Sequence, residues 1–304
     1  MKMTKKYGGI VVPMVTPLTA KGDIDQEAVG SIMTAFVQNN ISPLVMGTTG
    51  ESASFSNGER LAMLRAVVSQ KSANQQIYAG VVQNEVCQQV SQARNYLDLG
   101  ADAVVATLPG YYLLTPEQMK GHFEKLADAL EGPLFIYNIK ATTQMSIPLE
   151  IIDELSGHPH IKGLKDSERD ETRLRKAIER FKDNEEFSYF CGWGAATVKS
   201  LMLGADGVVP STGNLVPEMY RALYEAALAE DWDTASHYQK MTDGVAGIYQ
   251  ANKTLGQSLA ALKLLMQERS FCRPFMKPPL TMLDSRMAEQ VRSQWKDFQT
   301  GRKT

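Results

Sequence analysis

A lysine near the middle of the chain, Lys165, is the residue whose surroundings most clearly indicate chemistry. It ends a short apolar run, residues 161–165, and Asp166 and Ser167 follow it directly. Keeping a lysine charged inside an apolar strand is costly, so burial favours the neutral amine, which is a nucleophile toward carbonyl groups. The position of Lys165 therefore predicts imine (Schiff-base) chemistry.

A second lysine, Lys140, competes for this role because it follows another apolar run, residues 134–138. Lys162 lies at the other end of the run that holds Lys165 and is interpreted as a surface residue, whose ammonium stays in water while its stem packs. The residues alone leave the choice between Lys165 and Lys140 open.

Three tyrosines lie where they could assist such an amine. Tyr137 closes the run 134–138, and its phenol could carry a proton to and from a carbinolamine on Lys165. Core packing with a satisfied hydroxyl is the alternative for a tyrosine in a strand. Tyr111 and Tyr112 follow another apolar run and could add a second phenol, line the mouth of the site, or form a subunit contact.

The segment Gly47-Thr48-Thr49-Gly50 offers successive backbone N–H groups and two hydroxyls in a tight, glycine-flanked turn. Such a turn suits a carboxylate without requiring a cation, and a small 2-oxo acid fits that need. The alternative is an ordinary turn in which Glu51 serves only as a negative charge at a helix N-terminus.

The elements that must position these residues are short apolar runs separated by longer segments of helical period. The runs are continuous rather than alternating, which is typical of parallel strands covered on both faces. We expect an α/β fold, a (β/α)8 TIM barrel, whose active site lies at the carboxyl ends of the strands. The expected strands are residues 9–15, 43–48, 76–82, 101–108, 134–138, 161–165, 187–192 and 207–210, and the clearest helices are 26–38, 57–72, 85–99, 116–130 and 148–155.

The strand pattern stops after Leu215, and residues 217–300 have an almost wholly helical pattern, with a strong breaker only in the region of Arg273-Pro274 and Lys277-Pro278-Pro279. We therefore expect a catalytic barrel over residues 1–230 and a helical C-terminal extension over residues 231–304. Gly100 and Gly204 are expected to end helices directly before strands, because glycine adopts the left-handed conformation of a helix cap.

The composition restricts the classes of partner. With 43% hydrophobic residues, 22% charged residues and a net charge of -2, the chain can bury a core and offers no basic stripe for nucleic acid. It lacks the apolar stretch of about 18 residues that a membrane span needs. The three cysteines, Cys87, Cys191 and Cys272, are interpreted as buried thiols in a reducing, cytoplasmic compartment.

Motifs for metals and cofactors are weak. The pair His158 and His160 precedes the strand of Lys165, on the side of the barrel opposite the expected site, so no metal site is predicted there. The segment 192–197 has the first two glycines of a dinucleotide fingerprint but lacks the third. We expect neither a metal nor an organic cofactor.

Four segments together resemble a known family. They are similar to segments of the pyruvate-dependent class I aldolases, which include dihydrodipicolinate synthase and N-acetylneuraminate lyase. The four segments are GTTGE at 47–51, YN at 137–138, GLKDS at 163–167 and GADGVV at 204–209. The resemblance covers the whole chain. It implies a homotetramer built as a dimer of dimers and catalysis without a cofactor.

The resemblance also implies roles for single residues. Lys165 is similar to the imine-forming lysine and Tyr137 to the proton-relay tyrosine of the family. Thr48 and Thr49, next to Gly47, are similar to the binders of the pyruvate carboxylate. Tyr111 resembles the tyrosine that members lend across a subunit interface, and Val209 stands where a main-chain carbonyl faces the bound pyruvate.

Departures from the family concern the second substrate. Thr142 occupies the position of the arginine that holds the second carboxylate of aspartate semialdehyde in the synthase branch. Lys140 replaces a usual proline and could bind an anionic or hydroxylated group instead. Trp193, Gly194 and Ala195 stand where the lyase and sugar-acid branches tend to have acidic residues, which argues against a polyhydroxylated substrate.

The sequence therefore predicts a class I lyase that cleaves a 2-oxo acid into pyruvate and an aldehyde, or forms it from them. The alternatives within enzymes are a dihydrodipicolinate synthase and a 2-keto-3-deoxy sugar acid aldolase or dehydratase. Outside enzymes, the alternative is a 2-oxo acid binding protein that has lost turnover.

Overall fold

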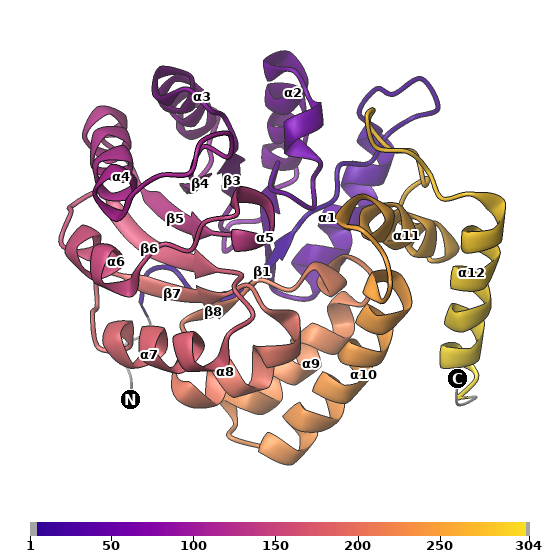
Figure 1. The fold of residues 1–304 in the computed structure, drawn as a ribbon. Coiled ribbons are helices and arrows are strands. Elements are labelled where there is room, and N and C mark those ends of the chain that lie inside the picture. Colours follow the sequence, from indigo (N-terminus) through magenta and orange to yellow (C-terminus); the bar gives the residue numbers. More distant parts are fainter. Residues whose placement is uncertain (1–4, 302–304) are drawn as a thin grey trace.

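A closed barrel of eight parallel strands forms the centre of the protein, as the computed structural model of residues 5–301 shows (Figure 1). Each strand pairs with its sequence neighbour, and β1 pairs with β8 to close the ring, with Ile10 opposite Val208. The expected TIM barrel is confirmed. The strands are β1 (Gly9–Pro13), β2 (Ile41–Val45), β3 (Tyr78–Val81), β4 (Ala103–Thr107), β5 (Leu134–Asn138), β6 (Ile161–Asp166), β7 (Ser188–Cys191) and β8 (Gly207–Val208).

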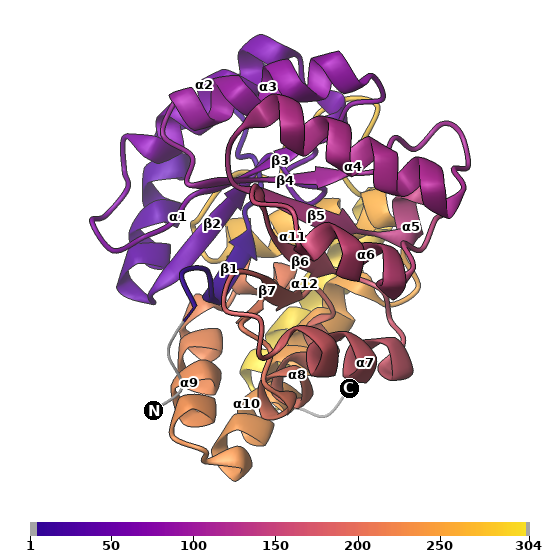
Figure 2. The ribbon, with the colours of Figure 1, turned by 90° about the vertical axis from the view of Figure 1, so that its left-hand side faces the viewer.

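Helices follow the strands and cover the outside of the barrel (Figures 1 and 2). Local signals set their bounds: Ser56 and Thr115 begin capping boxes, and Gly204 ends a helix at φ 99°. Gly100 likewise precedes β4 at φ 104°, as expected. The helices around the barrel are α1 (Gln26–Gln38), α2 (Asn57–Val68), α3 (Val86–Asp98), α4 (Pro116–Leu130), α6 (Leu149–Ser156), α7 (Glu171–Phe181), α8 (Thr197–Leu203) and α9 (Pro217–Leu228).

All strands except β5 differ from their expected ranges by one to three residues at an end, and the early ends of β2 and β8 bear on the site. β2 ends at Val45 because Met46 takes a left-handed conformation, with φ 54°, so the chain leaves the sheet before Thr48. β8 keeps only Gly207 and Val208. Residues at the ends of these two apolar runs therefore belong to loops at the mouth of the barrel.

Aromatic side chains fill the amino end of the barrel. The rings of Tyr78, Phe135 and Phe190 lie 5.0–5.7 Å apart between centroids, and Tyr7 packs edge-on against Phe135 at 5.3 Å. Gly163 makes room for this packing, since a Cβ there would lie 2.3 Å from the Phe135 ring. Inward-facing side chains thus close the barrel below the level of Tyr137 and Lys165.

The C-terminal extension consists of three helices that pack beside the barrel (Figure 1). They are α10 (Trp232–Gln250), α11 (Leu255–Glu268) and α12 (Ser285–Gln299). Residues 270–284 are not helical, and this interruption lies at the proline-containing region that the sequence marked as a helix breaker. Pro274, Pro278 and Pro279 explain the interruption, because proline lacks the N–H that a helix interior needs.

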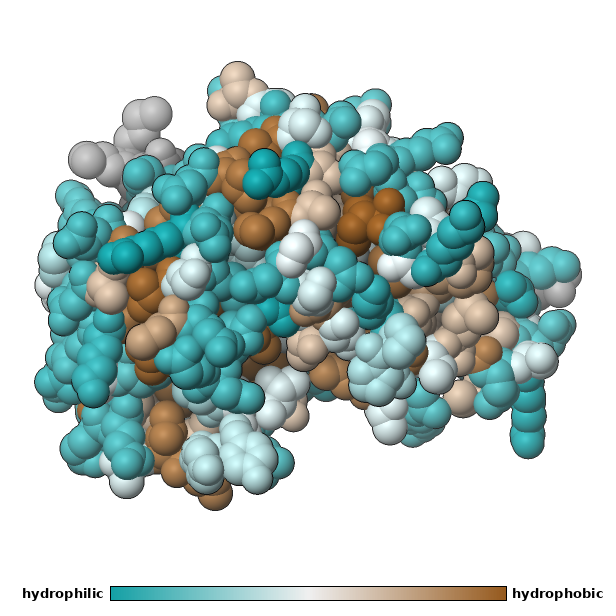
Figure 3. Space-filling view, turned by 90° about the horizontal axis from the view of Figure 1, so that it is seen from above, coloured by the Kyte–Doolittle hydropathy of each residue, from teal (hydrophilic) through white to brown (hydrophobic). Residues whose placement is uncertain are grey.

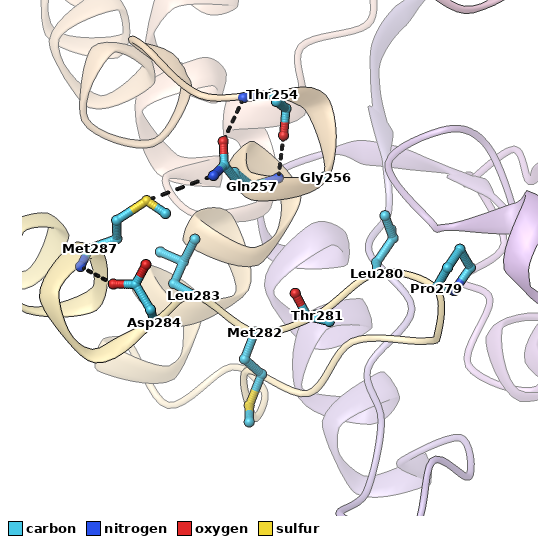
Figure 4. A pocket seen from close by; sticks show the side chains of 10 residues that line it. All are labelled: Thr254, Gly256, Gln257, Pro279, Leu280, Thr281, Met282, Leu283, Asp284 and Met287. Atoms are coloured by element: carbon cyan, nitrogen blue, oxygen red, sulfur yellow. Dashed lines mark hydrogen bonds between the residues drawn. The ribbon is translucent and has the colours of Figure 1, made fainter.

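A cavity of about 340 Å³ lies within the extension, between the start of α11, residues 279–284 and the start of α12 (Figure 4). Its polar groups serve helix ends: Thr254 and Gln257 form a capping box, and Asp284 caps α12 by accepting from the N–H of Met287. No residue expected at the active site lines it.

The face seen in Figure 3 is mainly hydrophilic, with apolar patches among the polar side chains. Among residues 5–301, no helix is long and apolar enough to cross a membrane. Cys191 and Cys272 are buried as expected, but Cys87 is exposed at the start of α3, which corrects its interpretation as a buried thiol.

Candidate active site

The central pair of the site is Lys165 on β6 and Tyr137 on β5. The two residues are register partners on adjacent parallel strands, so their side chains point the same way. Lys165 is 3% exposed and Tyr137 is 5% exposed. The Lys165 Nζ lies 3.8 Å from the centroid of the Tyr137 ring, so the amine and the phenol share one space near the carboxyl ends of their strands.

The charge of Lys165 tunes the phenol beside it. Burial raises the pKa of Tyr137, but the positive charge of Lys165 and hydrogen bonds with Thr48, Lys165 and Ser167 outweigh burial. The net result is a pKa of Tyr137 below its ordinary value of 10.0. A phenol with a lowered pKa exchanges protons more readily near neutral pH, which suits a general acid and base.

The Gly47–Gly50 turn lies beside this pair, since Thr48 interacts with the hydroxyl of Tyr137. The N–H of Gly50 donates to the carbonyl of Gly47 at 3.1 Å, and Thr49 is 9% exposed. Strand β3 passes directly under the turn: a Cβ on Gly80 would lie 2.4 Å from the Met46 carbonyl oxygen. The turn is therefore packed into the barrel, and its residues lie next to the amine and the phenol.

Glu51 ends the turn and has a different role from the expected charge at a helix N-terminus. Only a three-residue 3-10 helix, η1 (Ser52–Ser54), follows it, and the Glu51 side chain does not cap that helix. Instead, the buried carboxylate pairs with Lys263 of α11 and accepts a hydrogen bond from the Lys277 N–H at 2.8 Å. Sequence reasoning missed this contact because its partners come from the extension.

The structure distinguishes the two candidate lysines. Lys140 begins a short helix, α5 (Lys140–Thr143), and its side chain is 59% exposed. Its Nζ pairs with Glu168 at 3.5 Å on the rim of the barrel. Lys165 is enclosed beside a phenol, whereas Lys140 is a solvent-exposed ion pair, so only Lys165 shares an enclosed space with a second reactive group.

A polar network behind the barrel wall joins the two strands of the central pair. Asn138 donates to Asp166 at 2.8 Å and to Glu168 at 3.0 Å. Arg173 of α7 donates to Asp166 at 2.7 Å, and Ser146 donates to Glu168 at 2.6 Å. Because Asn138 and Asp166 directly follow Tyr137 and Lys165, the network fixes the relative position of the phenol and the amine.

Sequence reasoning did not assign roles to Asn138, Asp166, Glu168 or Arg173. Strand alternation was the available signal: since Tyr137 and Lys165 face inward, the residue after each must face outward. Two polar side chains on the outside of adjacent buried strands need partners, and an arginine in the next helix could supply one.

The remaining candidates lie around the mouth. Val209 is 3% exposed, follows β8, and belongs to the cluster of inward-facing side chains that includes Tyr137. Tyr111 is 80% exposed in the loop between β4 and α4, stacked edge-on against Tyr112 at 4.8 Å. One chain therefore brings Val209 to the site but leaves Tyr111 in solvent.

The histidine pair stays outside this arrangement. His158 lies 3.0 Å from the Asp128 carboxylate through its Nε2 atom, at the amino side of β6. Across residues 5–301, no three His, Cys, Asp or Glu side chains gather in a way that could hold a metal ion.

A (β/α)8 barrel with a buried lysine and a phenol at its carboxyl end defines a class of enzyme that acts on carbonyl compounds. Comparison with known proteins identifies the family. The model of the dihydrodipicolinate synthetase family matches residues 6–297, so the chain belongs to that family.

Relatives and solved structures agree with this assignment. The 4-hydroxy-tetrahydrodipicolinate synthase of Stutzerimonas stutzeri is 28% identical over 93% of this chain and 96% of its own length. Dihydrodipicolinate synthase from Bacteroides thetaiotaomicron superposes with a TM-score of 0.90 at 26% identity, covering 97% of this chain and all of that one. A prophage protein of the same family from E. coli K12, solved with pyruvate, has the same fold at 21% identity, with a TM-score of 0.90 over 97% of this chain and 99% of its own.

The protein is accordingly a pyruvate-dependent aldolase or lyase of the dihydrodipicolinate synthetase family. Members of this family act on pyruvate and an aldehyde.

Proposed function

We propose that the protein is a class I lyase that forms an imine between Lys165 and a 2-oxo acid and interconverts that acid with pyruvate and an aldehyde. The observation that supports this most directly is the enclosure of the Lys165 amine, 3% exposed, against the Tyr137 ring at 3.8 Å. The amine lies where a carbonyl entering the mouth of the barrel would meet it, and the phenol beside it supplies the proton transfers that imine formation requires.

In the cleavage direction, the Lys165 amine adds to the C2 carbonyl of a 4-hydroxy-2-oxo acid, and the carbinolamine loses water to give the iminium ion. The bond between C3 and C4 then breaks as its electrons move toward the iminium nitrogen. Tyr137, which has given its proton to the carbinolamine hydroxyl that left as water, takes the proton of the C4 hydroxyl as a phenolate, and the aldehyde leaves. The remaining enamine is protonated at C3, and water hydrolyses the imine to release pyruvate and the free amine.

The surrounding residues fit the binding of the carboxylate end. Thr48 and Thr49, with the backbone of Gly47, would hold the pyruvate carboxylate, and the carbonyl of Val209 would face the bound acid. Neither a metal nor an organic cofactor has a step in this mechanism, since the iminium ion is itself the electron acceptor.

We also propose that the exposed loop of Tyr111 packs against a second copy of the chain, within a homotetramer built as a dimer of dimers. Tyr111, Tyr112 and Leu113 are 80%, 72% and 73% exposed, an unusual concentration of apolar surface in one loop. In that arrangement Tyr111 would reach the neighbouring site and extend the proton relay.

Borohydride trapping tests the imine. Reduction in the presence of pyruvate should attach a stable three-carbon adduct to Lys165, located by mass spectrometry of peptides. The adduct should be lost in Lys165→Ala and kept in Lys140→Ala, and a chelator should not affect it. Trapping that persists in Lys165→Ala would contradict the assignment.

Tyr137→Phe separates an enzyme from a silent binding protein. This variant should form the trapped adduct more slowly but to the same final extent, while aldol cleavage falls about 10²–10⁴-fold because the proton relay is missing. A wild-type protein that traps pyruvate but never exchanges its methyl protons with solvent would be the binding protein instead.

A further inference from the structure

A fully buried ion pair connects the Gly47–Gly50 turn to the C-terminal extension. The side chain of Glu51 is 0% exposed and that of Lys263, in α11, is 1% exposed, and the two are in contact. Each makes one further bond to the segment that follows α11. The Glu51 carboxylate accepts from the Lys277 N–H at 2.8 Å, and the Lys263 ammonium donates to the Phe275 carbonyl at 2.8 Å.

Stability does not explain this pair. Removing two charges from water is costly, and well-packed apolar side chains in the same place are often as stable as a buried ion pair or more so. The pair does, however, fix the position of a residue that the backbone disfavours. Glu51 has φ 58°, in the left-handed region that residues other than glycine rarely adopt.

The conformation of Glu51 determines the shape of the turn before it. Its N–H donates to the Thr48 carbonyl at 3.1 Å, and the N–H of Ser52 returns to the Gly47 carbonyl at 3.3 Å. These bonds fold the backbone of Thr48 and Thr49 into one tight loop. A displacement of Glu51 would therefore move the hydroxyl and N–H groups offered to a carboxylate.

The charges of the pair also matter for an anion. A lone carboxylate next to the turn would repel a carboxylate ligand, and Lys263 neutralises it. The ion pair thus holds the turn with a directional, hydrogen-bonded contact while leaving it electrically close to neutral.

We propose that Glu51 and Lys263 are positioning residues, through which the C-terminal extension holds the carboxylate-binding turn in the shape that accepts a 2-oxo acid. This inference rests on the proposed imine chemistry. It implies that the extension sets the affinity of the site for pyruvate without touching the substrate.

The test is a double variant, Glu51→Gln with Lys263→Met, which removes both charges and nearly preserves both volumes. The pyruvate concentration that gives half-maximal borohydride trapping of Lys165 should rise about tenfold or more, because small misplacements of binding groups are costly. The extent of trapping at saturating pyruvate should change less than about twofold, because Lys165 and Tyr137 are untouched.

The matched control is Lys5→Met with Asp206→Asn, which removes a mostly buried pair at 2.9 Å near the amino ends of β1 and β8. This control should lower the free energy of unfolding and leave the pyruvate concentration for half-maximal trapping unchanged. If the Glu51 and Lys263 double variant behaves like the control, the pair is only structural and the inference is overturned.

Lys277→Ala decides the question if the double variant does not fold. The Lys277 side chain is partly exposed and binds Glu59 and the Gly22 carbonyl, so its loss loosens the segment whose N–H supports Glu51. A rise of about threefold in the pyruvate concentration for half-maximal trapping supports the inference, and an unchanged concentration contradicts it. A wild-type protein that traps no pyruvate on Lys165 overturns the proposed function, and the inference with it.

Discussion

Individual residues at the rim of the barrel bear on the choice of aldehyde. The Thr142 hydroxyl lies 3.4 Å from the Ile139 carbonyl, to which it donates, so this position offers neither a cation nor an unoccupied donor. The nearest lysine in sequence, Lys140, is already paired with Glu168. Trp193 packs partly buried against the core, with no acidic side chain in the two residues after it. We therefore propose an uncharged, weakly polar aldehyde as the second substrate.

An aldehyde panel with pyruvate measures this preference. Condensation with aspartate semialdehyde should be at least about 10²-fold slower than with the best uncharged aldehyde, since the charge-assisted grip on a second carboxylate is missing. Thr142→Arg should raise the rate with aspartate semialdehyde about tenfold and leave the uncharged aldehyde unaffected. If aspartate semialdehyde is already the fastest acceptor, Thr142 does not determine specificity as argued.

Among the elements, helix α4 contains a group that makes stability depend on pH. His122 is buried on its inner face beside Phe123, and its Nε2 has no hydrogen-bond partner within the described residues. Burial lowers the pKa of His122 from 6.5 to about 4. The histidine therefore stays neutral in the folded protein at pH values where it is protonated in the unfolded chain.

The free energy of unfolding should consequently fall as the pH decreases from 6.5 to about 4. Below that pH, His122 should cause no further change. The gap between the two pKa values corresponds to a loss of about 3 kcal/mol. Urea unfolding of His122→Leu at pH 7 and pH 4 should show that much less acid sensitivity than the wild type. His237→Gln, at an exposed position of α10, serves as the control, and equal sensitivity in all three proteins would contradict the assignment.

Sequence reasoning succeeded where the regular geometry of neighbouring strands determines which residues meet. Parallel strands place the residues at their carboxyl ends in one ring, so the meeting of Lys165 and Tyr137 follows from two apolar runs. The contact between Glu51 and Lys263 could not be predicted in this way, because it depends on how α11 packs against a loop far away in the sequence. Arg173 was missed for a related reason, since its outward-facing partner Asp166 was read only as part of a motif.

At the scale of the whole molecule, the extension supports three of the loops around the mouth. Besides its contact with Glu51, Gln239 of α10 donates to the Gly194 carbonyl after β7 at 3.1 Å. The hydroxyl of Tyr249 shares hydrogen bonds of 2.8 Å with Ser211 and Thr212 after β8. The extension thus helps to position the loops that follow β2, β7 and β8, so truncating it would disturb the candidate site.

The proposed assembly is the other property of the whole molecule that would affect the site. Leu113→Glu should separate the proposed dimers, detected as a smaller mass by light scattering, and lower cleavage about 10²-fold because Tyr111 no longer reaches its neighbour. Met282→Glu changes an exposed methionine of the extension and should alter neither mass nor rate. A wild-type protein that is monomeric and fully active would contradict the shared site.

The aromatic rings close the amino end of the barrel, so the barrel is open only at its carboxyl end. If a 2-oxo acid binds Lys165 as proposed, the two substrates must share this opening: in synthesis the acid would enter before the aldehyde, and in cleavage the aldehyde would leave before pyruvate. The packing of Tyr78, Phe135 and Phe190 would then impose an order on binding and release, although none of these side chains has a proposed role in the chemistry.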